Sequence, residues 1–316
     1  QEKQPGNLFP VRQNNKWGYI DRTGRLVIKP AFDAADEFVE GLAIVAKESN
    51  GEPIYGYIDM SGRLVIPIKY GYANRFRDGL ASVGDETGFS YIDHQGNTVI
   101  RVEDGSLPTS FSHGWAAVID AQEQVRFIDQ TGKAALQTTF VSVGGDWGEG
   151  LLPVLVNRNE GWCYIDKTGE VVLRTKFEEA EPFTDGLSAV QLDNKWGYID
   201  KTGKIIIPLR FDQADVFDQG LAPIRLGDRW GYIDKTGKIV IKPQFDRIAS
   251  PFSAEGLAGV FVDEKCGYID RSGKMLIGAQ YDMCREFFDE GITQVMLDDS
   301  IGYIDRAGNY VWPLTK

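Results

Sequence analysis

The sequence predicts an all-β protein, built as a tandem array of nine antiparallel units that each consist of a β-hairpin extended to three strands. Three observations predict this class. A tripeptide of an aromatic residue, Ile and Asp recurs nine times, at intervals of 34 to 38 residues, and each Asp is followed three places later by Gly. Short apolar runs flank the copies. No long window shows helical periodicity.

The Asp and the Gly of each copy predict a tight turn between two strands. In the segment 200–203 the Asp carboxylate can accept hydrogen bonds from the backbone of the turn, and Gly adopts a positive φ at no steric cost. We assign this structural role to Asp21, Gly24, Asp59, Gly62, Asp200, Gly203, Asp234, Gly237, Asp270 and Gly273. Calcium binding is a poor alternative, because each turn supplies one carboxylate and calcium takes roughly six to eight oxygen ligands.

The remaining parts of a unit are read in the same way. Trp230-Gly231 begins the strand before the turn, an apolar run such as 205–207 forms the strand after it, and a segment such as 221–224 supplies a third strand. The connecting segment between two units, for example 211–217, supplies either a short fourth strand or a packed crossover. Its aromatic residues are spaced to fill the gaps between stacked units.

One such sheet is too small to be stable alone, so neighbouring units must share a core. We predict a polar N-terminal tail at 1–7 and a single repeat domain at 8–316. The segment 8–12 matches 221–225, so the first unit already has its opening strand and no unit is divided between the two termini. Propellers usually have about four to eight blades. We therefore expect an open, solenoid-like array, with a β-propeller or propeller-like blades as the alternative.

The repeat resembles a known family. The pattern WGYIDKTGKIVI at 230–241, together with the P-x-F-D and F-x-(D/E)-G-L-A-x-V segments around it, resembles the bacterial WG-repeat proteins from about Leu8 to Pro313. This resemblance implies a β-structured repeat protein, mostly without an assigned activity, and it brings no catalytic residues. The third and fourth copies depart from the pattern, since their WG pair reads Phe89-Ser90 and Val125-Arg126.

Composition excludes several classes of partner. The formal net charge of -12 argues against nucleic acid and anionic lipid, because phosphate binding needs clustered Lys and Arg. No apolar stretch approaches the roughly 20 residues that cross a bilayer, so we expect no membrane insertion. The sequence does not decide the cellular compartment, although an exported form (periplasmic or extracellular) is slightly favoured over a cytoplasmic one.

Candidate catalytic residues are few. His94 and His113 are the only histidines, both in the divergent copies, and both are expected in solvated loops. The three cysteines follow no disulfide or zinc spacing, and we expect them to be small buried residues. We therefore expect no enzyme, no cofactor and no bound metal.

The loops that differ between the copies are the candidate interaction sites, because repeat proteins commonly bind partners through variable positions on a constant frame. The selected loop residues are Glu52, Asp85, His94, His113, Asp228, Asp298 and Asp299. We interpret the chain as a non-enzymatic binding or scaffold protein that mediates protein–protein interaction in a bacterium. A glycan or cell-wall binding module is the alternative, motivated by the 12% aromatic content.

Overall fold

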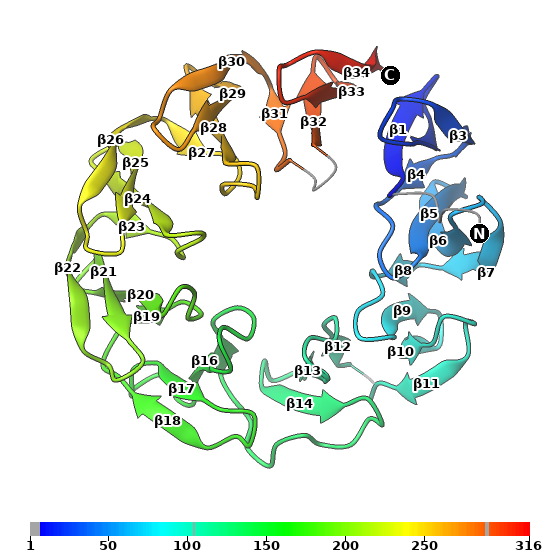
Figure 1. Ribbon diagram of the computed structural model, residues 1–316. Helices are drawn as coiled ribbons and strands as arrows, with labels where there is room; N and C mark the ends of the chain where they lie inside the picture. Colours follow the sequence, from blue (N-terminus) through cyan, green and yellow to red (C-terminus); the bar gives the residue numbers. More distant parts are fainter. Residues whose placement is uncertain (1–6, 104, 288–290) are drawn as a thin grey trace, which may run out of the picture. The chain divides into compact units, whose positions relative to one another are not determined.

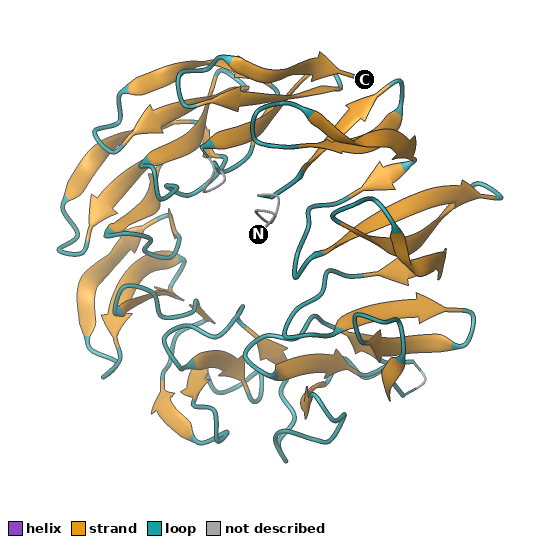
Figure 2. Cartoon of the chain, turned by 45° about the vertical axis from the view of Figure 1, so that its right-hand side comes forward, coloured by secondary structure: helices purple, strands orange, loops and turns teal. Residues whose placement is uncertain are grey.

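The computed structural model describes residues 7–103, 105–287 and 291–316, so the predicted tail lies outside it apart from Asn7. These residues form strands joined by turns and loops, and none of them is helical (Figure 2). The all-β prediction is confirmed.

The strands form nine antiparallel sheets, one for each repeat, which are called blades and numbered from the N-terminus. Blades 1 to 4 contain β1 (Phe9–Gln13), β2 (Lys16–Ile20) and β3 (Leu26–Phe32); β4 (Ala34–Ala35), β5 (Leu42–Ser49), β6 (Glu52–Asp59) and β7 (Leu64–Tyr70); β8 (Tyr72–Ala73), β9 (Ala81–Asp85), β10 (Gly88–Ile92) and β11 (Thr98–Arg101); and β12 (Leu107–Pro108), β13 (Trp115–Ile119) and β14 (Val125–Asp129).

Blades 5 to 9 each have four strands in chain order. They contain β15 (Ser142–Val143), β16 (Leu152–Leu155), β17 (Cys163–Ile165) and β18 (Val171–Arg174); β19 (Glu179–Ala180), β20 (Leu187–Leu192), β21 (Lys195–Asp200) and β22 (Ile205–Phe211); β23 (Gln213–Ala214), β24 (Leu221–Leu226), β25 (Arg229–Asp234) and β26 (Ile239–Phe245); β27 (Arg247–Ile248), β28 (Leu257–Val262), β29 (Lys265–Asp270) and β30 (Met275–Tyr281); and β31 (Met283–Cys284), β32 (Ile292–Leu297), β33 (Ser300–Asp305) and β34 (Tyr310–Thr315).

The chain divides into two compact units. Unit 1 contains residues 1–139, 300–302 and 311–316, and unit 2 contains residues 140–299 and 303–310. Blades 1 to 4 lie in unit 1 and blades 5 to 8 lie in unit 2, while the last blade contributes residues to both.

The connecting segment between repeats supplies a fourth strand in most blades. In blade 7 the short strand β23 pairs with β24 (Gln213 opposite Arg225), β24 pairs with β25, and β25 pairs with β26. Of the two roles left open for this segment, the short strand is the one that the structure contains. Three strands per unit therefore describe only blades 1 and 4, counted over the described residues.

The glycine of the WG pair lies where two backbones approach closely. The pairing of β25 with β26 shifts register between Trp230 and Tyr232. A Cβ atom on Gly231 would lie 2.4 Å from the carbonyl oxygen of Ile241 on the neighbouring strand. Only glycine fits this irregularity without displacing the outer strand, which accounts for its recurrence in the motif.

In blades 1 to 3 and 5 to 8 the tyrosine of the tripeptide joins its blade to the next one along the chain. Tyr198 is fully buried, and its ring packs against Phe217 of blade 7 with centroids 4.8 Å apart. Its hydroxyl donates a hydrogen bond of 2.7 Å to the backbone carbonyl of Asp215, also in blade 7. The core therefore lies between blades, so no blade has a complete core of its own.

The open, solenoid-like array is wrong. Within unit 1 the amide of Asn15 in blade 1 donates a 3.1 Å hydrogen bond to the carbonyl of Lys316 at the C-terminus. Gly24 also lies against the C-terminal strand, where an added Cβ would come within 2.2 Å of the carbonyl oxygen of Val311. The first and last repeats are therefore in contact, as in a β-propeller. Contact between the first and last repeats does not require a blade that is divided between the two termini. The undivided first unit in the sequence therefore did not exclude a propeller.

Candidate functional site

The ten predicted turn residues lie in five separate turns, each at the end of the second long strand of its blade. In blade 6 the Oδ1 atom of Asp200 accepts hydrogen bonds from the amide of Thr202 at 2.9 Å, the hydroxyl of Thr202 at 2.6 Å and the amide of Lys204 at 3.1 Å. Gly203 has a φ of 82° and donates its amide to the carbonyl of Asp200. The Asp200 carboxylate thus accepts its hydrogen bonds from residues of its own turn.

The pKa of the turn aspartates follows from these hydrogen bonds. The hydroxyl of Thr202 stabilises the ionised carboxylate of Asp200 and so lowers its pKa, with smaller contributions from the backbone amides. The aspartates of the other eight turns also have lowered pKa values. They remain charged acceptors at neutral pH, which is the opposite of a raised-pKa general acid.

A set of contacts that the sequence reading missed links consecutive blades. Glu149 precedes Gly150 in blade 5 and has a positive φ of 50°. One of its carboxylate oxygens accepts the amide of Gly186 at 2.9 Å, and the other pairs with the ammonium of Lys201 at 3.0 Å. Both partners belong to blade 6. The hydrogen bond from Lys201 lowers the pKa of Glu149.

The same arrangement, called the acidic clamp, recurs in other blades. Asp185 in blade 6 accepts the amide of Gly220 at 2.6 Å and lies 3.6 Å from Lys235, both in blade 7. Its sequence signal is an acidic residue directly before the loop Gly and a basic residue after the turn Asp. Both positions are visible in the repeat, but their proximity depends on the packing of two blades.

His94 takes the basic position of an acidic clamp. It lies 3.2 Å from the carboxylate of Glu40, which also accepts the amide of Gly79. Its ring stacks on Phe76 with centroids 4.3 Å apart. His94 is therefore half-buried between blades 2 and 3, although the sequence predicted a solvated loop position.

The other candidate loop residues lie in several different blades. Asp85 caps a turn by accepting the amide and the hydroxyl of Thr87, and His113 has a positive φ of 54° and contacts the hydroxyl of Ser112 at 2.9 Å. Glu52 and Asp228 are exposed at hairpin ends.

Asp298 and Asp299 form one hairpin turn together. They have positive φ values of 48° and 61°, as a two-residue type I′ turn requires. The amide of Asp298 also donates to the carboxylate of Asp282 at 2.8 Å. The acidic character of this loop is therefore tied to its backbone conformation.

Two of the three cysteines are joined. Cys266 and Cys284 form a disulfide between blades 8 and 9, with their Cα atoms 5.9 Å apart. Because the three cysteines show no regular spacing, the sequence did not predict this bond. Cys266 stands where Trp196 and Trp230 stand in blades 6 and 7, and Cys284 stands where blade 7 has Ala214. Both are buried as expected, but they act as a covalent pair.

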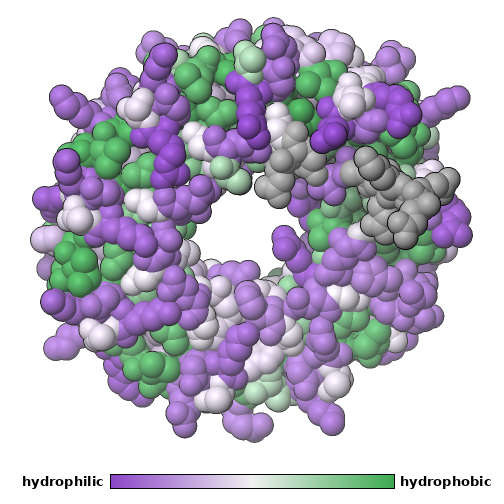
Figure 3. Space-filling view, in the orientation of Figure 1, coloured by the Kyte–Doolittle hydropathy of each residue, from purple (hydrophilic) through white to green (hydrophobic). Residues whose placement is uncertain are grey.

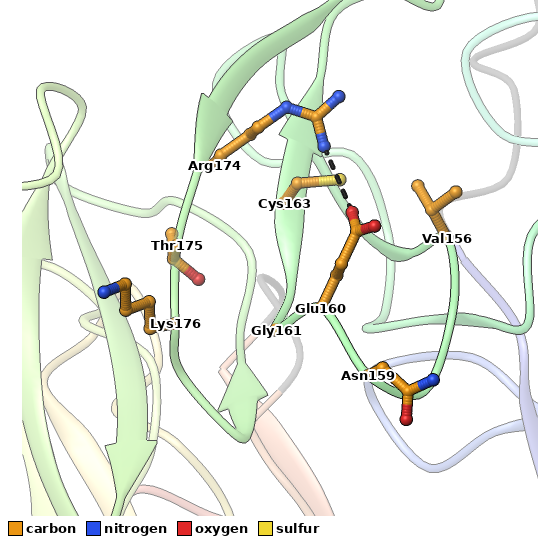
Figure 4. Close-up of a pocket in the computed structure, with 8 residues that line it drawn as sticks. All are labelled: Val156, Asn159, Glu160, Gly161, Cys163, Arg174, Thr175 and Lys176. Atoms are coloured by element: carbon orange, nitrogen blue, oxygen red, sulfur yellow. Dashed lines mark ion pairs between the residues drawn. The ribbon is translucent and has the colours of Figure 1, made fainter.

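Cys163, the free cysteine, lies beside a cavity of about 480 Å³ in blade 5 (Figure 4). Arg174 and Glu160 form an ion pair of 3.5 Å across this cavity. Burial raises the pKa of the Cys163 thiol, which keeps it protonated and poorly nucleophilic. The geometry gives the thiol no histidine partner among the lining residues.

Among the described residues, exposed apolar side chains lie on the last strands of blades in both units, and those of unit 2 extend over four consecutive blades, against three in unit 1. Those of unit 2 lie at or near the beginning of β18, β22, β26 and β30, the last strand of each blade (Figure 1). These side chains, called the outer row, are between 39% and 54% exposed and comprise Val172, Ile205, Ile206, Ile239, Val240 and Leu276. On the face seen in Figure 3, hydrophobic residues likewise form separate groups within a mostly hydrophilic surface.

Over the described ranges no three His, Cys, Asp or Glu side chains converge in a way that could hold a metal ion. Within the same part of the chain, no helix exists that could span a bilayer.

Comparison with known proteins adds the family and the fold. The family model described as "WG containing repeat" matches residues 17–50, 55–84, 162–196, 196–230, 230–266 and 267–299. Blade 4 lies outside these matches, in agreement with its divergent sequence. No curated protein matches the chain significantly.

Solved structures resemble the chain at low sequence identity. A structure described as the eukaryotic initiation factor is 14% identical, covers 98% of this chain and 97% of its own, and has a TM-score of 0.62. BamB from Moraxella catarrhalis (11% identity, 93% and 95% coverage, TM-score 0.49) and Kluyveromyces lactis Hsv2p (10%, 77% and 96%, 0.45) are more distant. The first likeness, over nearly both chains, shows a β-propeller fold and again contradicts an open array.

Proposed function

We propose a function from one established premise: this chain belongs to the WG-containing repeat family. The proposal is that the chain is a non-enzymatic scaffold that binds another protein. Its partner surface includes the outer row, so binding uses the outer strands of unit 2 in addition to, or in place of, the variable loops.

The outer row is the observation that supports this proposal. Single exposed apolar residues are common on protein surfaces, whereas repeated ones in one register on consecutive blades are informative. Each outer strand also has one backbone edge that pairs with no other strand of its blade. Such an edge, next to Ile and Val side chains, offers a partner both apolar contact and backbone hydrogen bonds.

The absence of an enzymatic role is part of the proposal. The phenols of the tripeptide tyrosines are buried, and burial raises the pKa of Tyr57, Tyr164 and Tyr198, so these phenols stay protonated. The turn carboxylates are held by their own backbones. The Cys163 thiol is protonated as well. These groups are therefore committed to structure.

The glycan alternative lacks support. Carbohydrate platforms use exposed aromatic rings, and the rings of Tyr19, Tyr198 and Tyr303 are fully buried. Among the described residues only Tyr72 and Tyr310 are aromatic side chains with large exposure, and they lie in blades 3 and 9. Two such separate rings do not make a stacking row.

The outer row can be tested by substitution. The fourfold variant Ile205→Ser, Ile206→Ser, Ile239→Ser and Val240→Ser should keep the fold, because these side chains are already partly in water. A partner is first identified by cross-linking and mass spectrometry and is then purified. Calorimetric titration should show at least a tenfold weaker Kd for the variant, since lost apolar contacts of this size are worth more than about 1.4 kcal/mol.

The matched control is Leu26→Ser with Val27→Ser, at the same register of β3 in unit 1. Its affinity should stay near that of the unaltered chain. Equal weakening by both variants would remove the assignment to unit 2, and unchanged binding by the fourfold variant would overturn the proposed surface.

A further inference from the structure

The hydroxyl of Tyr232 differs from its counterparts in other blades. In blades 2, 6 and 8 the hydroxyls of Tyr57, Tyr198 and Tyr268 donate at 2.7 Å to a backbone carbonyl 17 residues later. The Tyr232 side chain is equally buried, with 1% exposure, but its hydroxyl has no hydrogen-bond partner among the residues that the structure describes. A buried hydroxyl without a partner is unfavourable, because its hydrogen bonds to water are lost on folding and are not replaced.

The cause is a longer loop in blade 8. In blade 7 the amide of Asp215 bonds to the carbonyl of Pro223, eight positions later in the sequence. In blade 8 the corresponding bond runs from Ala249 to Gly259, and the amide of Ser250 shares the same carbonyl. The two extra residues bulge the chain at the position where Tyr232 should find its acceptor.

This bulge lies beside a cavity of about 310 Å³ between blades 7 and 8. Three aromatic residues, Trp230, Tyr232 and Phe252, line it, and the rings of the last two have centroids 5.0 Å apart. Aliphatic walls come from both blades. Aromatic walls of this kind attract cations, because the ring face carries negative charge.

Carboxylates add to this preference. Asp215 and Asp218 line the same cavity, and among the described residues neither carboxylate forms an ion pair. One oxygen of Asp215 accepts the amide of Val216 at 2.7 Å. Burial raises the pKa of Asp218, with a further contribution from the nearby Asp185, and the positive charge of Arg271 acts in the opposite direction. The guanidinium of Arg271 lies 5.3 Å from the centroid of the Phe252 ring. Arg247 also lines the cavity, but its guanidinium lies over the Phe261 ring, 3.8 Å from the centroid.

We propose that the cavity between blades 7 and 8 binds a primary alkylammonium group. The aromatic walls and the carboxylates of Asp215 and Asp218 hold the cation, and the alkyl stem fills the apolar part. An ammonium N–H donates to the oxygen of the Tyr232 hydroxyl. None of these residues belongs to the outer row, so this site and the proposed partner surface stand independently.

Binding of butylammonium to the full chain tests the proposal, with saturation-transfer NMR to detect contact and titration to give the affinity. Butanol, the neutral analogue, should not bind. The variant Tyr232→Phe should weaken butylammonium binding about tenfold, the effect of one hydrogen bond to a charged group. It should leave tetramethylammonium binding unchanged, because that cation has no N–H. The variant Asp218→Asn should weaken the binding of both cations.

The matched control is Tyr57→Phe in blade 2, whose hydroxyl already has its backbone acceptor, the carbonyl of Asn74, and it should not alter either affinity. Binding of Nα-acetyl-lysine amide as well as butylammonium would indicate that the ammonium group belongs to a lysine side chain. Binding of butylammonium alone would indicate a free amine. Failure of butylammonium to bind, or a crystal grown with it that shows only water on the Tyr232 oxygen, would overturn the site.

Discussion

At the scale of single residues, buried tyrosines decide how blades are joined. Tyr198 contributes both a ring contact and a hydrogen bond to the next blade. Tyr232 contributes the ring contact with Phe252 but not the hydrogen bond. The same residue type at the same register thus stabilises two interfaces to different degrees.

Removal of the tyrosine hydroxyl should have different effects on stability at positions 198 and 232. Tyr198→Phe leaves the carbonyl of Asp215 without its donor and should lower the free energy of unfolding by about 1 kcal/mol. Tyr232→Phe removes a hydroxyl that has no partner and should be neutral or stabilising. Thermal denaturation followed by circular dichroism measures both, and an equal loss of Tm in the two variants would contradict the assignment.

Gly203 is required for two reasons, and only one of them was predictable. Its positive φ follows from the turn pattern, since an Asp followed three residues later by Gly is a local signal. The second reason is that an added Cβ would lie 2.8 Å from the side chain of Leu173 in blade 5. That contact joins two blades, so it could not be read from the turn itself.

Alanine at two glycines can separate these reasons. Gly203→Ala should combine backbone strain with the contact to Leu173, whereas Gly220, with a φ of 84°, has no atom within 4 Å of an added Cβ. We expect Gly220→Ala to cost about 1 kcal/mol and Gly203→Ala to cost more, toward 3 kcal/mol. Chemical denaturation gives both values. Equal denaturation midpoints for the two variants would show that the Leu173 side chain moves away from the added Cβ without a loss of stability.

At the scale of elements, the short first strand of a blade connects the core to the preceding blade. Cys284 in β31 and Cys266 in β29 show this covalently. The sequence predicted the long strands well because each has a continuous apolar run. It left the short strands undecided, because two residues give no periodicity and their pairing depends on the neighbouring strand.

Reduction of the disulfide should destabilise this part of unit 2. The bond joins residues 18 positions apart, and a loop of this size is worth about 3 kcal/mol in the chain-entropy account. Thermal denaturation with and without a reductant should therefore show a lower Tm in the reduced chain. The double variant Cys266→Ala with Cys284→Ala is the control, and its Tm should not respond to the reductant. A response there would assign the effect to Cys163 instead.

At the scale of the whole molecule, contact between the first and last repeats was the feature least accessible to sequence. Asn15 and Lys316 lie at opposite ends of the chain, and the local pattern of a repeat is the same in open and closed arrays. The outer row was hidden for a related reason. Runs such as 205–207 are predicted only as strands, and the exposure of Ile205 and Ile206 follows from the final position of β22 in its sheet.

Acid should destabilise the whole chain, because the pKa values of all nine turn aspartates are lowered in the folded state. The unfolded chain therefore binds more protons at low pH. The stabilising contribution is present above the ordinary value of 3.8 and is lost as the pH falls through the folded pKa values. Tm should thus change little between neutral pH and about pH 5 and should fall steeply below about pH 4. The variant Asp200→Asn should lose stability at neutral pH and show a smaller acid response, and an acid-insensitive Tm would contradict the turn assignment.

The disulfide between blades 8 and 9 also offers a rule for engineering the array. Cys266 and Cys284 occupy the register of Trp196 and Ala214, which pack against one core cluster between blades 6 and 7. The same pair of positions in neighbouring blades is therefore filled by a packed indole and an alanine at one interface and by a disulfide at another. A paired replacement, Trp196→Cys with Ala214→Cys, should transfer the cross-link to that interface, so that individual interfaces could be locked one at a time under oxidising conditions.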